Sequence, residues 1–115
     1  MDRRSYDQFC GIAKALDVVG ERWTLLIVRN LLIGPLRYSD LLRGLPGITT
    51  NLLAKRLREL EDAGLIEKVR GTAGGASAYR LTPRGAALEP VLLALSRWGA
   101  PLLTTRRKGE HADLE

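Results

Sequence analysis

The sequence predicts a mainly α-helical fold with a small β-hairpin, a winged helix-turn-helix with dimerisation helices on its N- and C-terminal sides. Two observations predict it. Four helical patterns precede a change to short strand-like segments, and the excess positive charge is confined to the helical region. A chain of 115 residues can bury one ordinary core. We therefore expect a single domain over 1-115, with a core of about 10-100 and flexible tails at 1-9 and 104-115.

The first two helices are predicted from apolar spacing and stop signals. The first places Ile12 and Leu16 on one side, and Gly20 can close it in a left-handed conformation. The second, within residues 21–33, is apolar over much of its circumference and is stopped by a Gly-Pro pair. We expect this second helix to lie at the centre of the core.

Two shorter amphipathic helices follow. The third has Ser39 as a candidate N-cap, and the fourth has Thr49 or Thr50 as its N-cap and Gly64 as its stop. On a 3.6-residue period the leucines of the fourth helix fall on one stripe, and its polar residues fall nearly opposite. The fourth helix therefore docks on a core with one side and leaves a basic side available for contact.

The pattern changes after the fourth helix. Residues 65–71 and 77–82 are strand-like segments on either side of a glycine-rich turn, as in a hairpin. Helical spacing then resumes with Thr82 as the N-cap and Pro83 at the first helical position. Pro90 must kink this last helix or split it in two.

The net charge of +5 is unevenly distributed. Residues 22–58 hold seven basic residues and one acid, whereas the rest of the chain holds eleven basic and twelve acidic residues. An excess of +6 in about one third of the chain indicates an anionic partner that contacts this region.

Several other classes of protein are disfavoured. No apolar run approaches the roughly 18 residues that span a bilayer. Cys10 is the only cysteine, so no disulfide within the chain and no multi-cysteine zinc site is expected. His111, the only histidine, lies in a polar tail. We expect no catalytic site, no cofactor and no metal, and a cytoplasmic location by default.

The order of helices and hairpin predicts how the anionic partner would be bound. In a winged helix-turn-helix the second helix of the pair enters the major groove of DNA and the preceding helix crosses the backbone. The ordinary alternative is a solvated polar face, and Arg56 lies closer to the leucine stripe than its neighbours. The candidate DNA-binding residues are Thr50, Asn51, Lys55, Arg56, Arg58, Arg37, Ser39, Arg70 and Thr72.

Four segments occur in this order and spacing: "CGIAKALDVVGERWTLLIVRNLLIGPLRYSDLLRGLPGI", "LLAKRLRELEDAGLIEK", "YRLTPRGAAL" and "RWG". Through these segments the chain resembles the HxlR-type winged-helix transcriptional regulators of bacteria and archaea, relatives of the MarR group. The resemblance covers about residues 10–99. One departure is the segment "GTAGGASAY", because such regulators often carry prolines before the second strand of the wing.

The last helix carries an apolar stripe outside the predicted three-helix core. Burial against the first helix of a second copy would cover it and give a symmetric homodimer that binds a palindromic operator. The resemblance implies the same arrangement. The expected dimer-interface residues are Ile12, Leu16, Leu88, Val91, Leu92, Leu95 and Trp98.

Cys10 precedes the first turn of a helix, with Arg3, Arg4 and Lys14 nearby in the sequence. The helix dipole and these cations would favour the thiolate. Some regulators of the resembling family sense oxidants or electrophiles through a cysteine at this position. The alternative is a half-buried thiol that behaves as a small hydrophobe.

These observations predict a dimeric, sequence-specific regulator that binds double-stranded DNA and responds to thiol chemistry or to a small molecule at the dimer interface. Two alternatives remain open. The chain could be a winged-helix module that binds protein, or an architectural protein that binds DNA without sequence preference.

Overall fold

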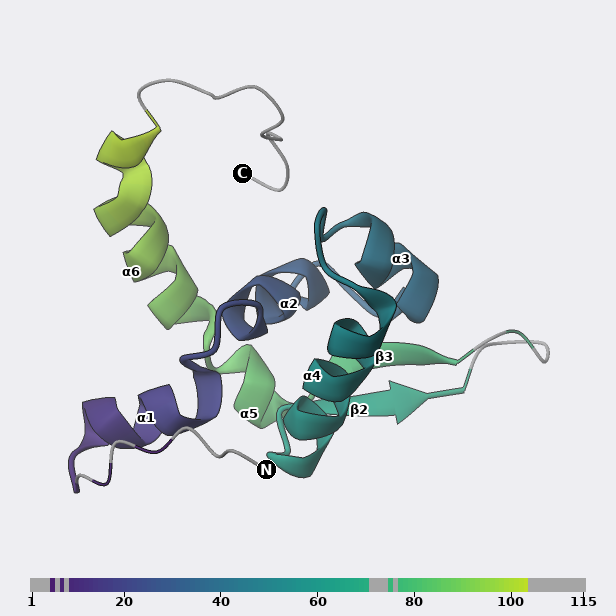
Figure 1. Cartoon of the computed structure of the whole chain (residues 1–115), viewed down its shortest axis with the longest axis horizontal. Coiled ribbons are helices and arrows are strands. Elements are labelled where there is room, and N and C mark those ends of the chain that lie inside the picture. The colour runs from purple at the N-terminus through teal and green to yellow at the C-terminus, as the bar shows by residue number, and fades with distance from the viewer. Residues whose placement is uncertain (1–4, 6, 8, 71–74, 76, 104–115) are drawn as a thin grey trace.

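The computed structural model describes residues 5, 7, 9–70, 75 and 77–103. Figure 1 shows helices packed with a small sheet in the body of the molecule, and the first and last long helices of the described chain at one side. The mainly helical winged fold predicted from the sequence is confirmed. The elements are α1 (Gly11–Val19), α2 (Thr24–Leu31), β1 (Leu36–Arg37), α3 (Tyr38–Arg43), α4 (Thr50–Asp62), β2 (Ile66–Val69), β3 (Ala78–Leu81), α5 (Pro83–Ala86), α6 (Glu89–Gly99) and a 3-10 turn (Ala100–Leu102).

The sheet has one strand more than the predicted hairpin. Strands β2 and β3 pair in antiparallel fashion, and the short strand β1 pairs with the other edge of β3, with Leu36 opposite Tyr79. β1 runs directly into α3, so the expected N-cap at Ser39 is wrong. Arg37 occupies that position, and its backbone N–H donates to Asp40 Oδ2 at 3.2 Å.

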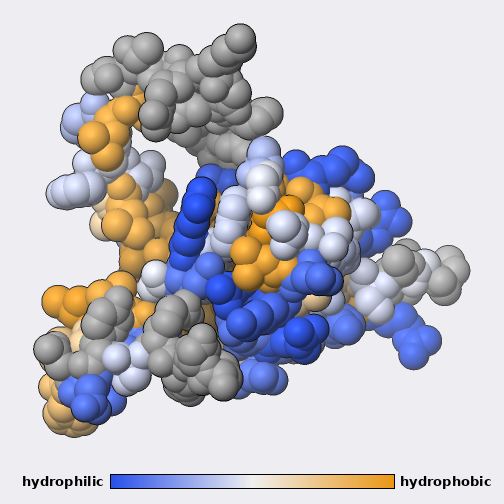
Figure 2. Space-filling model, viewed as in Figure 1, coloured by the Kyte–Doolittle hydropathy of each residue, from blue (hydrophilic) through white to orange (hydrophobic). Residues whose placement is uncertain are grey.

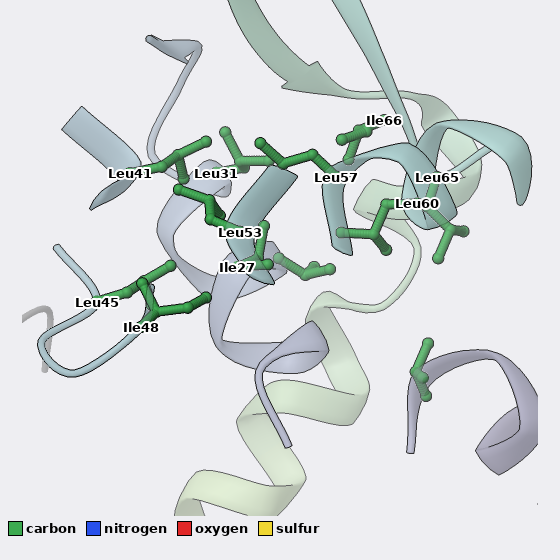
Figure 3. Close-up of a cluster of buried hydrophobic side chains, with 12 residues drawn as sticks. Ile27, Leu31, Leu41, Leu45, Ile48, Leu53, Leu57, Leu60, Leu65 and Ile66 are labelled. Carbon is green, nitrogen blue, oxygen red and sulfur yellow. The ribbon is translucent and has the colours of Figure 1, made fainter. Parts of the chain in front are cut away.

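The core lies between α2, α3, α4 and the start of β2, as Figure 3 shows. The predicted leucine stripe of α4 is confirmed, because Leu53, Leu57 and Leu60 are at most 2% exposed. Ile27 of α2 and Leu41 of α3 are fully buried beside them. Each such side chain stabilises the fold by roughly 1.5–3 kcal/mol relative to an exposed position. This burial fixes which side of α4 faces solvent.

The ends of α4 follow the predicted signals. The Thr49 hydroxyl accepts the N–H of Leu52 at 3.2 Å, and Gly64 follows the helix with φ +78. A positive φ favours glycine because it has no Cβ. The hydroxyl of Thr82, which caps α5, donates to the carbonyl of Gly64 at 2.6 Å. This bond ties the exit of α4 to the entry of the C-terminal segment.

Two further predictions about helix ends had different outcomes. The split at Pro90 is confirmed, because α5 and α6 are separate helices and Pro90 lies in the first turn of α6. The left-handed conformation expected for Gly20 is wrong, since its φ is −79. Glycine is favoured there for another reason. A Cβ at this position would lie 2.5 Å from the carbonyl oxygen of Leu16.

Helices α1 and α6 lie at the edge of the molecule, and α6 extends away from the body (Figure 1). In the part of the chain that the structure describes, no helix is long and apolar enough to cross a membrane. The tail predicted at 104–115 lies outside the described residues, as does most of the tail predicted at 1–9.

Candidate nucleic-acid interface

The outward side of α4 carries a row of polar and basic side chains. Thr50, Asn51, Lys55 and Arg58 are all exposed. The opposite side of the helix is the buried leucine stripe, so these four residues cannot turn inward without exposing the core. Figure 2 shows hydrophilic surface over much of α4, next to a hydrophobic patch in the middle of the view. The structure therefore brings together four of the five predicted residues of this helix.

Arg56 is the fifth, and it does not join that surface. Its side chain is only 14% exposed. Its guanidinium lies 3.0 Å from Glu21 Oε1 through Nε and 2.9 Å from Glu59 Oε1 through Nη1. The structure thus places Arg56 in an intramolecular cluster with two carboxylates. A partial signal for this placement is that Arg56 falls nearest to the leucine stripe on the helical period.

The start of α4 is fixed by a neighbouring aromatic residue. Tyr38, the first residue of α3, donates its hydroxyl to the carbonyl oxygen of Thr50 at 2.5 Å. Both the Thr49 cap and this bond hold the first turn of α4. The N-terminal end of α4, where Thr50 and Asn51 are exposed, is therefore a defined rather than a frayed end.

Arg37 and Ser39 are both exposed at the start of α3. Asp40 lies between two arginines of this segment, with its carboxylate 3.7 Å from Arg37 Nε and 2.5 Å from Arg43 Nη2. The pKa of Asp40 is held below its usual 3.8, first by the hydrogen bond from the backbone of Arg37. Loss of solvation opposes this shift, and the charges of Arg37 and Arg43 and the hydrogen bond from Arg43 add to the lowering. Arg43 was not among the predicted site residues. Its spacing of three residues from Asp40 was the available signal.

The wing, which is the hairpin of β2 and β3, contributes further cations. Arg70 is exposed after β2, as predicted, whereas Thr72 lies outside the described residues. Lys68 lies over the ring of Tyr79 at 5.6 Å from the centroid, and Arg80 pairs with Glu67 at 2.7 Å across the hairpin. Lys68 was not among the predicted site residues. It is exposed on β2 and belongs to none of the salt bridges found among the described residues.

The candidate sensing residue lies at a helix start. Cys10 is an exposed free cysteine, and its Sγ accepts the N–H of Ala13 at 3.3 Å as the N-cap of α1. The predicted position at the first turn is confirmed. The reactivity of this thiol stays a prediction.

The predicted dimer residues fall into two groups. Leu88 and Leu92 pack against the core and attach α6 to the body. The others are exposed apolar side chains, and Figure 2 shows their hydrophobic surface over α1 and α6. Their exposed fractions are 76% for Ile12, 40% for Leu16, 45% for Val91, 48% for Leu95 and 77% for Trp98.

The described residues contain no group of three or more histidine, cysteine or acidic side chains that could hold a metal ion. The charged features instead gather on α3, α4 and the wing. These are the three elements that contact DNA in winged helix-turn-helix proteins. We therefore take the exposed residues of these elements as the candidate nucleic-acid interface.

Comparison with known proteins identifies the family of the chain. Residues 18–107 match the family described as HxlR-like helix-turn-helix. Rv3095 of Mycobacterium tuberculosis, described as an uncharacterized HTH-type transcriptional regulator, is 38% identical over 113 aligned positions, covering 89% of this chain and 71% of the relative.

Two solved structures of regulators are also similar. The redox regulator HypR in its oxidised form has a TM-score of 0.73 and 31% identity, covering 85% of this chain and 99% of HypR. The quinone-bound YodB from Bacillus subtilis has a TM-score of 0.67 and 32% identity, covering 78% of this chain and 96% of YodB. The chain thus belongs to the HxlR-like helix-turn-helix family and is a transcriptional regulator.

Proposed function

We propose that this regulator binds double-stranded DNA with sequence specificity by inserting α4 into the major groove. The observation that carries the proposal is the composition of the exposed side of α4. It presents Thr50 and Asn51 near the helix start and Lys55 and Arg58 further along, above a side fixed by buried leucines. Asparagine and arginine side chains are suited to contacts with base edges, and lysine to contacts with phosphate.

The flanking elements supply contacts with the DNA backbone. Arg37 and Ser39 at the start of α3 and Arg70 at the wing are exposed and lie in elements adjacent to α4. Thr72 belongs to the same proposed set from its sequence position alone. Arg56 is left out because its guanidinium is occupied by Glu21 and Glu59. Each phosphate neutralised by such residues releases counterions, which makes binding dependent on salt.

The proposal includes a homodimer. The exposed apolar residues of α1 and α6 form a surface that a second copy would cover, and a two-fold symmetric pair would place two α4 helices over a palindromic operator. Leu88 and Leu92 support this interface indirectly, because they pack against the core and attach α6 to it. A regulator of DNA acts where the DNA is, so the proposal also includes a cytoplasmic location.

We further propose that thiol chemistry at Cys10 controls binding. The supporting observations are its exposure at the start of α1 and the similarity to a redox regulator and to a quinone-bound regulator. Cys10 is the only cysteine of the sequence. A disulfide must therefore join two subunits, each thiol giving up one hydrogen to an oxidant, or form with a small thiol. A small molecule at the α1 and α6 interface is the alternative signal.

The DNA proposal is tested by fluorescence anisotropy with a duplex from upstream of the gene for this protein, with scrambled duplex as competitor. We expect a preference of roughly a thousandfold or more for the native duplex. Equal competition would support the non-specific architectural alternative. An absence of salt-dependent binding would support the protein-interaction alternative.

Point variants test the interface itself. We expect Lys55→Ala to reduce the magnitude of the slope of log K against log salt concentration by about 0.9, because one phosphate contact is lost. We expect Arg58→Ala to reduce the free energy of DNA binding by about 1–3 kcal/mol. Arg84→Ala is the matched control, because it removes an exposed positive charge from α5, outside the three interface elements. A loss of binding in Arg84→Ala as large as in Lys55→Ala would place the interface elsewhere.

Cys10→Ser tests the sensing step. We expect an oxidant or a quinone to change the DNA affinity of the wild type and to leave Cys10→Ser unaffected. Serine keeps a side chain that can accept the N–H of Ala13, so the start of α1 is preserved. An equal response in both proteins would remove Cys10 from the mechanism.

A further inference from the structure

One buried ion pair connects two parts of the chain that lie far apart in the sequence. Glu21 follows the end of α1, and Arg56 lies in the middle of α4. Their side chains are 9% and 14% exposed, and Glu21 Oε1 lies 3.0 Å from Arg56 Nε. The Nε–H has no hydrogen-bond partner among the described residues, so the contact is electrostatic rather than a directed bond.

Glu21 is itself fixed by α2. Its Oε1 accepts the backbone N–H of Trp23 at 2.8 Å and the hydroxyl of Thr24 at 3.2 Å. The carboxylate therefore resists following Arg56 if α4 moves, because two groups at the start of α2 hold the oxygen atom that faces Arg56. Because the Glu21 carboxylate is largely buried and held by fixed partners, it restrains the position of the Arg56 guanidinium that pairs with it.

The segment between α1 and α2 also lies beside the turn that precedes α4. A Cβ at Gly47 would lie 3.8 Å from Cη2 of Trp23, so the indole ring lies beside the turn that precedes α4. Gly47 has φ +97, a conformation that side chains rarely adopt. Residues Glu21 and Trp23 thus contact α4 at its middle and the turn at its entry.

We propose that Glu21 and Arg56 are positioning residues, which hold α4 at the orientation required for DNA and link it to the end of α1. Neither residue contacts DNA. This inference rests on the proposed function, since it explains how the presented face of α4 is oriented. It replaces the expected phosphate contact of Arg56 by a contact within the protein.

Two matched variants test the inference in the full-length protein. Glu21→Gln keeps the oxygen that accepts from Trp23 and Thr24 but removes the charge that faces Arg56. Glu59→Gln removes the other carboxylate of Arg56, 2.9 Å away on α4 itself, which cannot orient α4 against α2. We expect Glu21→Gln to weaken binding of the native duplex about tenfold with an unchanged salt slope, and Glu59→Gln to stay within about twofold.

Two results would overturn the inference. Equal effects of the two variants would mean that the link to α2 does not matter. Tighter binding with a steeper salt slope in Glu21→Gln would mean that the released Arg56 reaches a phosphate. If Glu21→Gln does not fold, Arg56→Lys is used instead, because it keeps the charge and loses the planar head that spans both carboxylates.

A measurement without DNA separates this inference from the proposed function. A double-mutant cycle of Glu21→Gln and Arg56→Gln by urea unfolding is expected to show coupling, and additive effects would overturn the inference alone. In a Trp98→Phe background, we expect the emission of Trp23 to shift in Glu21→Gln and not in Glu59→Gln. Absence of salt-dependent duplex binding in the wild type would overturn the proposed function, and with it the role of the pair in recognition.

Discussion

Helices α4 and α6 have similar amphipathic patterns but different surroundings. In α4 the leucine stripe is buried in the core of its own chain, whereas α6 has no buried residue. Leu57 is 1% exposed and Leu95 is 48% exposed. An apolar stripe therefore predicts that a helix packs against a partner, and only the packing shows whether that partner lies in the same chain. The polar side of α4 is exposed because its apolar side is buried in the core, as the proposed contact with DNA requires.

The largest expected effect separates the two helices by stability. Leu57→Ala removes a fully buried side chain and should lower the free energy of unfolding by about 2–5 kcal/mol, since a cavity remains. Urea unfolding followed by circular dichroism measures it.

The matched control for this prediction is Leu93→Ala, at a position of α6 that is 49% exposed. We expect a change within about 0.5 kcal/mol. If Leu93→Ala destabilises the protein as much as Leu57→Ala, the difference in burial does not explain the difference between the helices.

The next effect concerns the partner of α6. Leu95 lies on the stripe with Val91 and Trp98, and Leu93 lies on the opposite side of the helix at the same exposure. We expect Leu95→Asp to weaken homodimerisation tenfold or more, because a charge would be placed in an apolar interface, and Leu93→Asp to change it by about twofold at most. Sedimentation velocity over a dilution series gives both dissociation constants. A monomeric wild type, or equal effects, would contradict the proposed interface.

The comparison also explains which features the sequence could predict. The stripe of α4, its cap at Thr49 and its stop at Gly64 follow from local spacing and residue type, and all three are confirmed. Local patterns could not show strand β1, because two residues are too few for a periodic signal. The partner of Arg56 was also hidden, since Glu21 is 35 positions away and only the packing of α2 on α4 brings the two charges together.

Candidate site residues divide in the same way. Exposed positions such as Asn51, Lys55 and Arg58 could be placed on one face from the helical period. Lys68 and Arg43 were missed because their positions depend on the sheet and on a short helix, in which side-chain direction follows from tertiary structure. The glycine at position 20 was noted for the wrong reason, because the close approach of Leu16 is not visible in a sequence.

The smallest expected effect depends on pH and distinguishes α3 from α4. The hydroxyl of Thr49 caps α4 and does not titrate, whereas the carboxylate of Asp40 accepts the N–H of Arg37, the residue that precedes α3. The pKa of Asp40 is lowered from 3.8 in the folded state. Its ionised form therefore stabilises the fold above about pH 4, and this contribution is lost as the pH falls through the lowered pKa.

Asp40→Asn should remove this contribution at every pH. The free energies of unfolding of wild type and variant should therefore differ most near neutral pH and converge below the lowered pKa, which urea unfolding between pH 7 and pH 3 would measure. The effect is the smallest of the three because Asp40 is accessible to solvent and water screens its charge. If the difference in free energy of unfolding between wild type and Asp40→Asn stays constant down to pH 3, the charge of Asp40 does not contribute. The start of α3 would then be held, like that of α4, by a cap that does not titrate.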